Sequence, residues 1–210
     1  MTGQVLTNVD VSRETILDLE TYVGLLKKWN VKINLISRST ESDIWTRHIA
    51  DSVQVFDLHT HTKEDPKWFD LGSGGGLPGL VCAILAKNTA LNSTHFTLVE
   101  SDARKSVFLK TVARELGLNN ISVINDRIEN VTGQQPADII SARALADLTR
   151  LIELTEHLSS PNTVFLFPKG RTWEKEVEDA QNKWKFESNL IKSCTASEAV
   201  VLKIKGVRRV

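Results

Sequence analysis

Apolar positions in the first part of the chain recur at helical spacing. They fall at positions 16, 19, 23 and 26 and again at 22, 25, 29 and 33, which is the period of a helix with a broad buried face. The pattern predicts a helix over residues 12–35, capped by Ser12 or Asp10, and a shorter amphipathic helix over residues 41–56. The polar residues 59–66 end in a proline and predict a loop.

From position 67 the pattern changes to short apolar runs that alternate with helical stretches. The runs are expected to form strands at residues 68–71, 95–99, 121–125, 137–141 and 163–168. Helices are expected between them, at residues 78–87, 103–116 and 145–158. This alternation is typical of βαβ units, in which a parallel sheet is buried on both faces.

The end of the chain adds a charged helix and two further strands. The helix is expected at residues 174–185, and the runs 187–192 and 199–204 are expected to pair as an antiparallel edge. The sequence therefore predicts a doubly wound, Rossmann-like α/β fold with a mostly parallel, seven-stranded sheet. Residues 1–66 are expected to form an N-terminal helical extension packed on this core, and residues 67–210 the domain itself, as a single structural unit.

Composition agrees with one globular core. The 210 residues are 41% hydrophobic and 25% charged, which argues against disorder. No apolar stretch approaches the roughly 18 residues needed to span a bilayer. Residues Met1 to Val5 lack the basic start and the apolar core of a secretory signal. We therefore expect a cytosolic, monomeric protein without a membrane partner.

Charge and cysteine content narrow the class of protein further. Lys and Arg together number 26, as do Asp and Glu, so the chain has no global basic field and nucleic acid binding requires a local patch. Cys82 and Cys194 have no Cys-x-x-Cys spacing, so neither a disulfide framework nor a metal site is expected. Both thiols are expected to be reduced and buried.

Candidate chemistry gathers at the carboxyl ends of the expected strands, where open parallel sheets bind their ligands. The first strand ends at Asp70 and runs into a loop with five glycines between positions 72 and 79, which lets a ligand approach the backbone and the start of the next helix. The second strand ends at Glu100, whose carboxylate suits a pair of ribose hydroxyls. Polar residues also follow the other three strands, at 126–129, 141–143 and 169–170.

Two cofactor classes fit the glycine-rich loop. Gly74, Gly76 and Gly79 satisfy the G-x-G-x-x-G pattern of dinucleotide-binding proteins, so a nicotinamide-dependent oxidoreductase is one alternative. Asp70 argues against it, because a carboxylate two residues before the first glycine does not suit a pyrophosphate and does suit the cationic amino acid end of S-adenosylmethionine. A non-enzymatic RNA-binding or scaffolding protein that retains the fold is the other alternative.

Several short motifs, in their order and spacing, resemble one family of enzymes. They are Trp29-Asn30 with Asn34-Leu35, Arg47-His48-Ile49 with Asp51-Ser52, the loop 70–79, Glu100-Ser101, Arg127-Ile128-Glu129, Ser141-Ala142-Arg143-Ala144 and Lys169-Gly170. The chain is similar over most of its length to the guanine-N7 methyltransferases of bacterial 16S ribosomal RNA, also called RsmG or glucose-inhibited division protein B. It departs from them at Val31, where the family often has lysine, and at Ala142, which lies inside a segment usually written Ser-Arg-Ala.

The resemblance implies a class I S-adenosylmethionine-dependent methyltransferase that modifies N7 of guanine 527 in 16S ribosomal RNA or in the small ribosomal subunit. It also implies a cofactor site formed by Gly72, Leu77, Ile128, Glu129 and Arg143. The residues at strand ends and in the loop add three more to those expected to bind the cofactor, which are Asp70, Gly74 and Glu100.

Methyl transfer to guanine N7 needs no proton transfer, because N7 carries a free in-plane lone pair. We therefore expect no catalytic acid or base and assign no catalytic residue. His48 is expected to be a packed residue of the second helix, with Asp51 as its hydrogen-bond partner, rather than a general base. Arg143 or Lys169 is expected to donate to O6 of the guanine while N7 stays free.

Basic residues near the expected cofactor edge are the candidates for RNA contact. We expect phosphate contacts from the five that lie nearest to it, which are Arg47, Arg104, Lys105, Lys169 and Arg171. Base stacking is a less favoured role for the tryptophans, since Trp29 lies on an apolar helix face and Trp68 inside a strand. Together with Trp45 they are expected to pack in the core.

Overall fold

The computed structural model describes residues 11–59 and 64–210. Residues 1–10, among them the alternative helix cap Asp10, and residues 60–63 of the expected polar loop lie outside the described part. The α-helices are α1 (Arg13–Asn30), α2 (Ala50–Asp57), α3 (Gly79–Lys87), α4 (Ala103–Glu115), α5 (Leu148–Thr155) and α6 (Trp173–Gln181). The strands are β1 (Lys67–Leu71), β2 (His95–Val99), β3 (Ile121–Ile124), β4 (Ile139–Ala142), β5 (Val164–Lys169), β6 (Trp184–Lys192) and β7 (Val200–Arg209). Short 3₁₀ or π stretches are η1 (Arg38–Thr40), η2 (Trp45–Ile49), η3 (Ile128–Asn130) and η4 (Glu156–Leu158).

Among the described residues, seven strands form one sheet in the order β3-β2-β1-β4-β5-β7-β6. The first five pair in parallel, and β7 pairs antiparallel with both β5 and β6. The expected mostly parallel, seven-stranded sheet is confirmed, and so is the antiparallel pairing of the last two strands. The strand order reverses between β1 and β4, which is the topological switch point where such sheets bind ligands.

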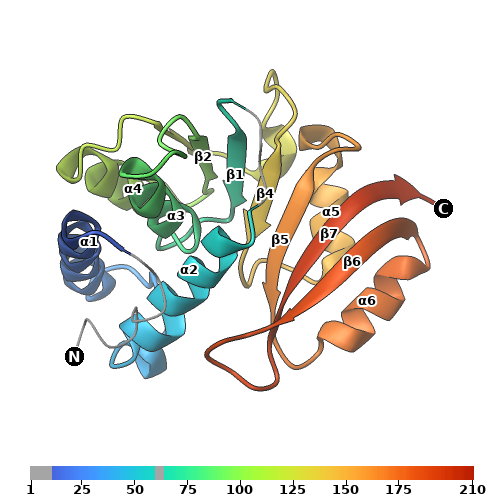
Figure 1. The fold of residues 1–210 in the computed structure, drawn as a ribbon, viewed down its shortest axis with the longest axis horizontal. Coiled ribbons are helices and arrows are strands. Elements are labelled where there is room, and N and C mark those ends of the chain that lie inside the picture. Colours follow the sequence, from blue (N-terminus) through green and yellow to red (C-terminus); the bar gives the residue numbers. More distant parts are fainter. Residues whose placement is uncertain (1–10, 60–63) are drawn as a thin grey trace.

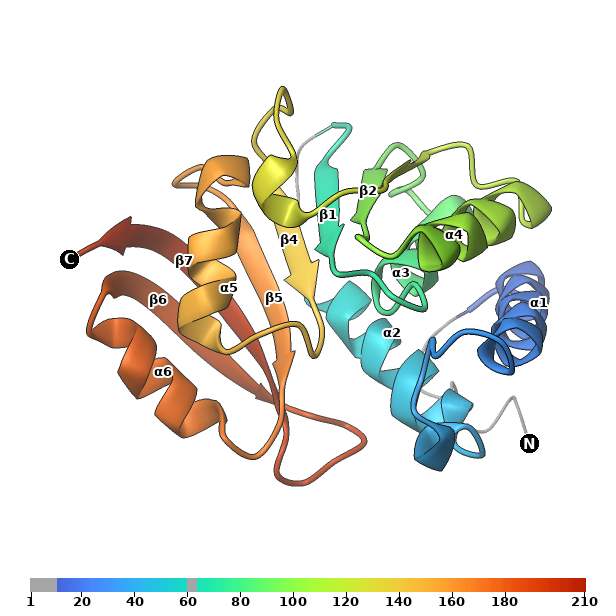
Figure 2. The same cartoon turned by 180° about the vertical axis from the view of Figure 1, so that it is seen from behind.

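Helices cover both faces of the sheet. In Figure 1, α2 and α3 lie in front of the sheet, and the apolar side chains of α1 and α4 join the same core. Figure 2, the view from behind, shows α5 and α6 on the opposite face. Neighbouring residues of β1 alternate between the two cores, with Trp68 in the first and Phe69 in the second. This burial on both faces explains why the strands appear in the sequence as continuous apolar runs.

The first two helices are shorter than the sequence predicts. α1 ends at Asn30 rather than at Leu35, because the Asn30 side chain replaces a helical carbonyl. Its Oδ1 accepts hydrogen bonds from the N–H groups of Leu35 (2.9 Å) and Ile36 (3.1 Å). These bonds turn the chain back toward the sheet. The helix expected over residues 41–56 begins later, at Trp45, as a π-helical turn that continues into α2.

Two later helices also have ends that differ from the prediction. The helix expected at residues 145–158 begins at Leu148, because the side chain of Asp147 caps it by accepting a hydrogen bond (2.9 Å) from a backbone N–H of the first turn. The helix expected at residues 174–185 ends early. Trp184 already belongs to β6, where it is 3% exposed and packs in the core.

The N-terminal helices pack within the same core as the sheet. The hydroxyl of Tyr22, in α1, donates to the carbonyl oxygen of Gly75 (2.7 Å) in the loop after β1. Leu26 and Leu35 lie against the same glycine, where a Cβ would come within 3.3 Å of each. α1 therefore supports the glycine-rich loop directly.

The two cysteines differ in burial. Cys82 is buried in α3, as expected, but the expectation that Cys194 is buried is wrong, since it is exposed. Cys194 lies in the loop between β6 and β7, where its backbone N–H rather than its side chain makes the principal contact, to Oε1 of Gln54 (3.1 Å). Both are free thiols.

None of the helices formed by residues 11–59 and 64–210 is both long enough and apolar enough to cross a bilayer. In the same part of the chain, no group of three or more His, Cys, Asp or Glu side chains is arranged to hold a metal ion.

Asn30→Ala should lower the free energy of unfolding by about 2 kcal/mol, because two buried N–H groups lose their acceptor. Asn34→Ala is the matched control. It removes an exposed amide four residues later in the chain and should change the free energy by less than about 0.5 kcal/mol. Urea titration of both variants measures the difference, and equal values would contradict the role of the Asn30 side chain.

Candidate functional site

Two clefts open where the parallel strands end. One, of about 350 Å³, lies beside the glycine-rich loop 72–79 and is called the glycine-loop cleft. The other, of about 300 Å³, lies between α2, the end of β5 and the loop 193–199, and is called the α2 cleft. Ala146 borders both. The loop 143–147 after β4 is therefore the wall between the two clefts.

The glycine-rich loop is tied to β2 by Glu100. The Glu100 Oε2 accepts the N–H of Gly74 (2.8 Å), and its Oε1 accepts the N–H of Asp102 (2.8 Å), the residue that caps α4. Glu100 is 7% exposed. Each carboxylate oxygen keeps capacity for a further donor. Glu100 thus sets the course of the loop and the start of α4 together.

Asp70 lies beneath the glycine-rich loop and is 1% exposed. Its Oδ1 accepts a hydrogen bond from the Ser141 hydroxyl (2.7 Å), and its Oδ2 has no hydrogen-bond partner among the described residues. Gly79 is required above it, since a Cβ there would lie 2.7 Å from Oδ2. Burial raises the pKa of Asp70 to about 6, against the lowering effect of the Ser141 hydrogen bond.

Three of the residues expected to bind the cofactor line the glycine-loop cleft, namely Gly72, Ile128 and Glu129. Gly72 has a φ of 63°, and a Cβ at this position would lie 2.7 Å from Cδ1 of Leu145. Only glycine therefore adopts this conformation readily while leaving the cleft open. Leu145 was not singled out by the sequence, because it reaches Gly72 only when the wall loop folds back.

The other five expected cofactor residues lie elsewhere at this edge. Arg143 borders the α2 cleft. Leu77 is 4% exposed and packs into the core shared by α1 and α3. Asp70, Gly74 and Glu100 form or support the glycine-rich loop from behind. Their direct contact with a ligand stays a prediction.

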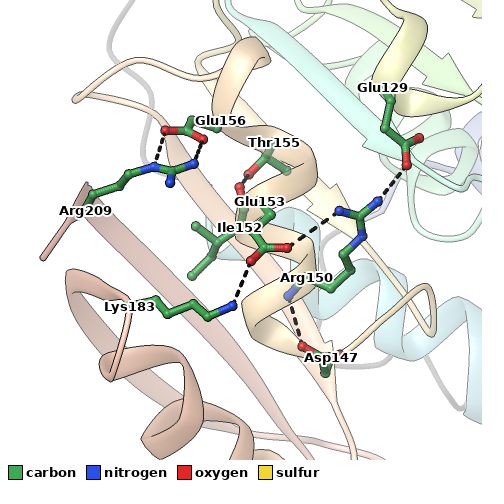
Figure 3. Close-up of polar contacts among 9 residues, drawn as sticks. All are labelled: Glu129, Asp147, Arg150, Ile152, Glu153, Thr155, Glu156, Lys183 and Arg209. Carbon is green, nitrogen blue, oxygen red and sulfur yellow. Dashed lines mark hydrogen bonds and ion pairs between the residues drawn. The ribbon is translucent and has the colours of Figure 1, made fainter.

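A chain of exposed ion pairs runs from the rim of the glycine-loop cleft along α5 (Figure 3). Glu129 binds Arg150 (2.7 Å), Arg150 approaches Glu153 (3.6 Å), and Glu153 binds Lys183 (3.2 Å). Arg150 also lines the cleft. The sequence pattern does not identify it, because Arg150 belongs to the first turn of a helix whose start depends on the Asp147 cap. Exposed pairs of this kind contribute little stability, so their main effect is to orient Glu129.

Arg143 is held by a neutral histidine at the side of the α2 cleft. Its Nη1 donates to Nδ1 of His48 (2.8 Å), and Nε2 of His48 pairs with the Thr40 hydroxyl (2.9 Å). A guanidinium only donates, so Nδ1 must accept and the ring proton resides on Nε2. Burial, with Arg143 and then Arg47, lowers the pKa of His48 to about 4. His48 is thus a packed residue, as expected.

The expected hydrogen bond between His48 and Asp51 is wrong. Asp51 instead accepts a hydrogen bond at Oδ1 from the hydroxyl of Thr195, in the loop before β7. His48 lies in η2 and Asp51 in the first turn of α2, and the Asp51 side chain is directed toward the C-terminal hairpin. The partner could not be read from helical spacing, since 144 residues separate it from Asp51.

The basic residues expected to contact RNA are placed in different environments. Arg47 is exposed and lines the α2 cleft. Arg104 and Lys105 lie in the first turn of α4, where Arg104 pairs with Asp102 (2.9 Å). Arg171 is exposed beyond β5 and pairs with a glutamate of the loop before β7 (3.0 Å).

Lys169 differs from these four, since it is only 9% exposed. Its Nζ donates to the carbonyl oxygen of Ala146 (2.7 Å) and to Oε2 of Glu176 (2.7 Å). The same Glu176 oxygen accepts the N–H of Leu148 (3.1 Å). Lys169 therefore holds the wall between the clefts, and its expected contact with RNA stays a prediction.

Trp29, Trp45 and Trp68 pack against the core, Trp68 fully buried and the other two partly buried. Trp68 is 1% exposed, and its Nε1 donates to the Ser141 hydroxyl (2.9 Å). Ser141 in turn donates to Asp70, so Trp68 helps to orient the buried carboxylate. Trp29 packs against Phe108 at a ring-centroid distance of 5.7 Å, and Trp45 packs against the same core.

Comparison with known proteins identifies close relatives over the whole chain. The family model described as rRNA small subunit methyltransferase G matches residues 15–203. The chain is 50% identical over 208 residues to the ribosomal RNA small subunit methyltransferase G of Ruegeria sp. (strain TM1040), covering 99% of this chain and 98% of that protein. It is 46% identical over 211 residues to the protein of the same name from Cereibacter sphaeroides (strain ATCC 17029 / ATH 2.4.9), covering 100% of both.

Two solved structures share the fold of this chain. A methyltransferase from Geobacter sulfurreducens superposes with a TM-score of 0.61 at 12% identity, covering 94% of this chain and 98% of that one. M. jannaschii TYW2, solved in complex with AdoMet, superposes with a TM-score of 0.57 at 15% identity, covering 86% and 80% of the two chains. At these identities the likeness concerns the fold alone.

Asp70→Asn should remove a pH dependence of stability. The pKa of Asp70 is about 6 in the folded protein and 3.8 ordinarily. Between these two values the folded protein keeps the proton that the unfolded chain has lost, so protonation of Asp70 stabilises the folded state. The stability of the unmodified protein relative to the variant should therefore be constant below about pH 4, fall by about 3 kcal/mol as pH rises to 6, and stay constant above. Urea titrations between pH 4 and 8 measure this difference, and parallel curves for the two proteins would refute it.

Proposed function

The chain belongs to the rRNA small subunit methyltransferase G family, and on this premise we propose that it transfers a methyl group from S-adenosylmethionine to N7 of guanine 527 in 16S ribosomal RNA. It is an S-adenosylmethionine-dependent methyltransferase of small-subunit ribosomal RNA. The observation that carries the proposal is the pair of clefts at one strand edge, separated only by the loop 143–147. One cleft suits the cofactor and the other the base.

The glycine-loop cleft has the features that S-adenosylmethionine requires. Gly72 lines the cleft without a side chain, and Ile128 and Glu129 border the same cleft. Asp70 places negative potential under the loop, and its Oδ2 has no hydrogen-bond partner among the described residues, which suits the cationic amino acid end of the cofactor. When bound, the cofactor supplies a sulfonium methyl group for in-line attack.

We propose that all eight expected residues contribute to the cofactor site in two ways. Contact is proposed for Gly72, Ile128 and Glu129, which line the cleft. For the other five we propose that they hold the glycine-rich loop in place or contribute charge near the cofactor. They are Asp70, Gly74, Leu77, Glu100 and Arg143.

The chain's own part in the reaction is to orient the base and exclude water. Guanine N7 attacks with its lone pair and releases no proton, so no general base is required. His48 does not supply one, because both of its ring nitrogens are engaged, by Arg143 and Thr40. Its pKa of about 4 keeps it neutral at physiological pH.

RNA binding is proposed for the five basic residues expected to contact phosphates. Arg47, which lines the α2 cleft, and Arg104, Lys105 and Arg171, which lie outside both clefts, are at least partly exposed and suit phosphate contacts. Lys169 joins them by exchanging its bond with Glu176 for a phosphate. A local patch of this kind agrees with the balanced net charge of the chain.

We further propose that the protein acts as a monomer in the cytosol, on 16S ribosomal RNA or on the small ribosomal subunit. The match extends over nearly the full length of the relatives. Membership of this family argues against the two alternatives considered for the sequence, a nicotinamide-dependent oxidoreductase and a non-enzymatic RNA-binding or scaffolding protein.

The test is methyl transfer from radiolabelled S-adenosylmethionine to undermethylated small ribosomal subunits and to RNA extracted from them, followed by nucleoside analysis. Label in 7-methylguanosine at position 527 is the expected result. Label in another nucleoside, or none in either substrate while the cofactor binds, would overturn the assignment.

Gly72→Ala should weaken S-adenosylmethionine binding by at least about tenfold, equivalent to about 1.4 kcal/mol, because the new Cβ would lie 2.7 Å from Cδ1 of Leu145 and displace that side chain, which lines the glycine-loop cleft. Gly117→Ala is the matched control. Gly117 has nearly the same φ, 62°, but nothing lies within 4 Å of a Cβ there. It should cost about 1 kcal/mol of stability through backbone strain and leave cofactor affinity unchanged. Calorimetric titration decides, and equal affinity of the two variants would contradict a cofactor at Gly72.

A further inference from the structure

The α2 cleft contains a carboxylate that methyl transfer itself does not use. Asp51, in the first turn of α2, lines the cleft together with Arg47 and Arg143. Neither arginine forms an ion pair with it among the described residues. Burial raises the pKa of the Asp51 carboxyl, and both arginines act against that rise. Asp51 is therefore a partly buried hydrogen-bond acceptor close to two arginines that do not form ion pairs with it.

The Asp51 carboxylate is held in a defined orientation. Thr195 donates to its Oδ1. One turn further along α2, Gln54 fixes the same loop by donating to the carbonyl oxygen of Lys192 (2.7 Å) and accepting the N–H of Cys194 (3.1 Å). Among the described residues, no donor reaches Asp51 Oδ2. Most of the acceptor capacity of this carboxylate is thus open to a ligand in the cleft.

Guanine is the base whose edge matches such a carboxylate. Its Watson–Crick edge carries two adjacent donors, N1–H and the N2 amino group, which a carboxylate accepts in parallel. Adenine presents an acceptor at N1 and would be repelled. Enzymes that modify a base after taking it out of the stack read it through this edge. A pocket built to pair these donors therefore distinguishes guanine strongly from bases without them.

The position of the cleft agrees with the geometry of the reaction. N7 lies on the side of the purine opposite to N1 and N2. A guanine with its Watson–Crick edge at Asp51 on α2 therefore directs N7 away from that helix. Ala146, in the wall loop, borders both this cleft and the glycine-loop cleft, so N7 would face the side from which the methyl group comes.

We propose that the α2 cleft holds the target guanine and that Asp51 accepts hydrogen bonds from its N1 and N2, which makes Asp51 the specificity-determining residue. The proposal rests on the proposed function and names the substrate-recognition site within it. O6, adjacent to N1, is left to Arg143, whose Nη1 is held by His48.

The experiment uses small ribosomal subunits reconstituted with 16S RNA that carries either guanosine or inosine at position 527. Inosine lacks only the N2 amino group and keeps N1–H, O6 and N7. The unmodified enzyme should methylate inosine with a kcat/KM about ten- to a hundredfold lower, the effect of a lost hydrogen bond to a charged group. Equal rates on the two substrates would overturn the proposal without any substitution in the protein.

The Asp51→Asn variant tests whether a lower rate on inosine comes from the lost contact with the N2 amino group or from a different reactivity of inosine N7. This variant should be slow on guanosine, and its ratio of guanosine to inosine rates should fall to within about threefold of one. The Thr195 hydroxyl keeps the amide oxygen at the Oδ1 position, so an NH2 group replaces the acceptor Oδ2 and the pair with the guanine edge is lost. Asp57→Asn is the matched control, because Asp57 ends the same helix, is exposed and borders neither cleft. Its ratio should equal that of the unmodified enzyme.

A ratio in Asp51→Asn equal to that of the unmodified enzyme would overturn the proposal, whatever the absolute rates. The absence of any 7-methylguanosine with the unmodified enzyme on the guanosine substrate would instead overturn the proposed function. The two failures are therefore distinguishable.

Discussion

The backbone of the glycine-rich loop is bound from two sides by side chains that are distant in the sequence. Tyr22 of α1 donates to the carbonyl oxygen of Gly75, and Glu100 at the end of β2 accepts the N–H of Gly74. A chain so rich in glycine has little conformational preference of its own, so these bonds determine its course. The position of the loop above Asp70 and beside the glycine-loop cleft depends on them.

Among the described residues, neither Arg143 nor Asp51 at the α2 cleft forms a direct ion pair. Arg143 is bound by the neutral His48 rather than by a carboxylate, so no directly bonded anion compensates its positive charge. Asp51 and Asp70 both contribute to its surroundings without bonding to it. A carboxylate at position 48 would neutralise Arg143 and weaken its attraction for O6 or phosphate. The edge therefore keeps separate positive and negative sites, which suits one cationic and one polyanionic ligand.

The predicted elements agree with the observed ones where hydrophobic periodicity determines them, and differ where a side-chain hydrogen bond does. The parallel strands were predictable because burial on both faces leaves continuous apolar runs, as in β1 and β5. Helix ends were predicted less well. α1 stops where the Asn30 side chain takes over two N–H groups, and α5 starts where Asp147 caps it. Such side-chain bonds compete locally with the helix, and hydrophobic periodicity does not report them.

The sequence by itself determined the order of the elements, the glycine-rich loop, the polar residues at the strand ends and the family, because each is encoded by residues that are neighbours along the chain. Only the tertiary structure decided which of those residues face a cleft. It encloses Asp70, turns Lys169 onto Glu176 and Ala146, and brings Asp51 to Thr195. The last contact joins segments 144 residues apart, and it exists because the sheet places β7 next to β5, beside α2. Packing of distant segments, which no local pattern encodes, sets these partners.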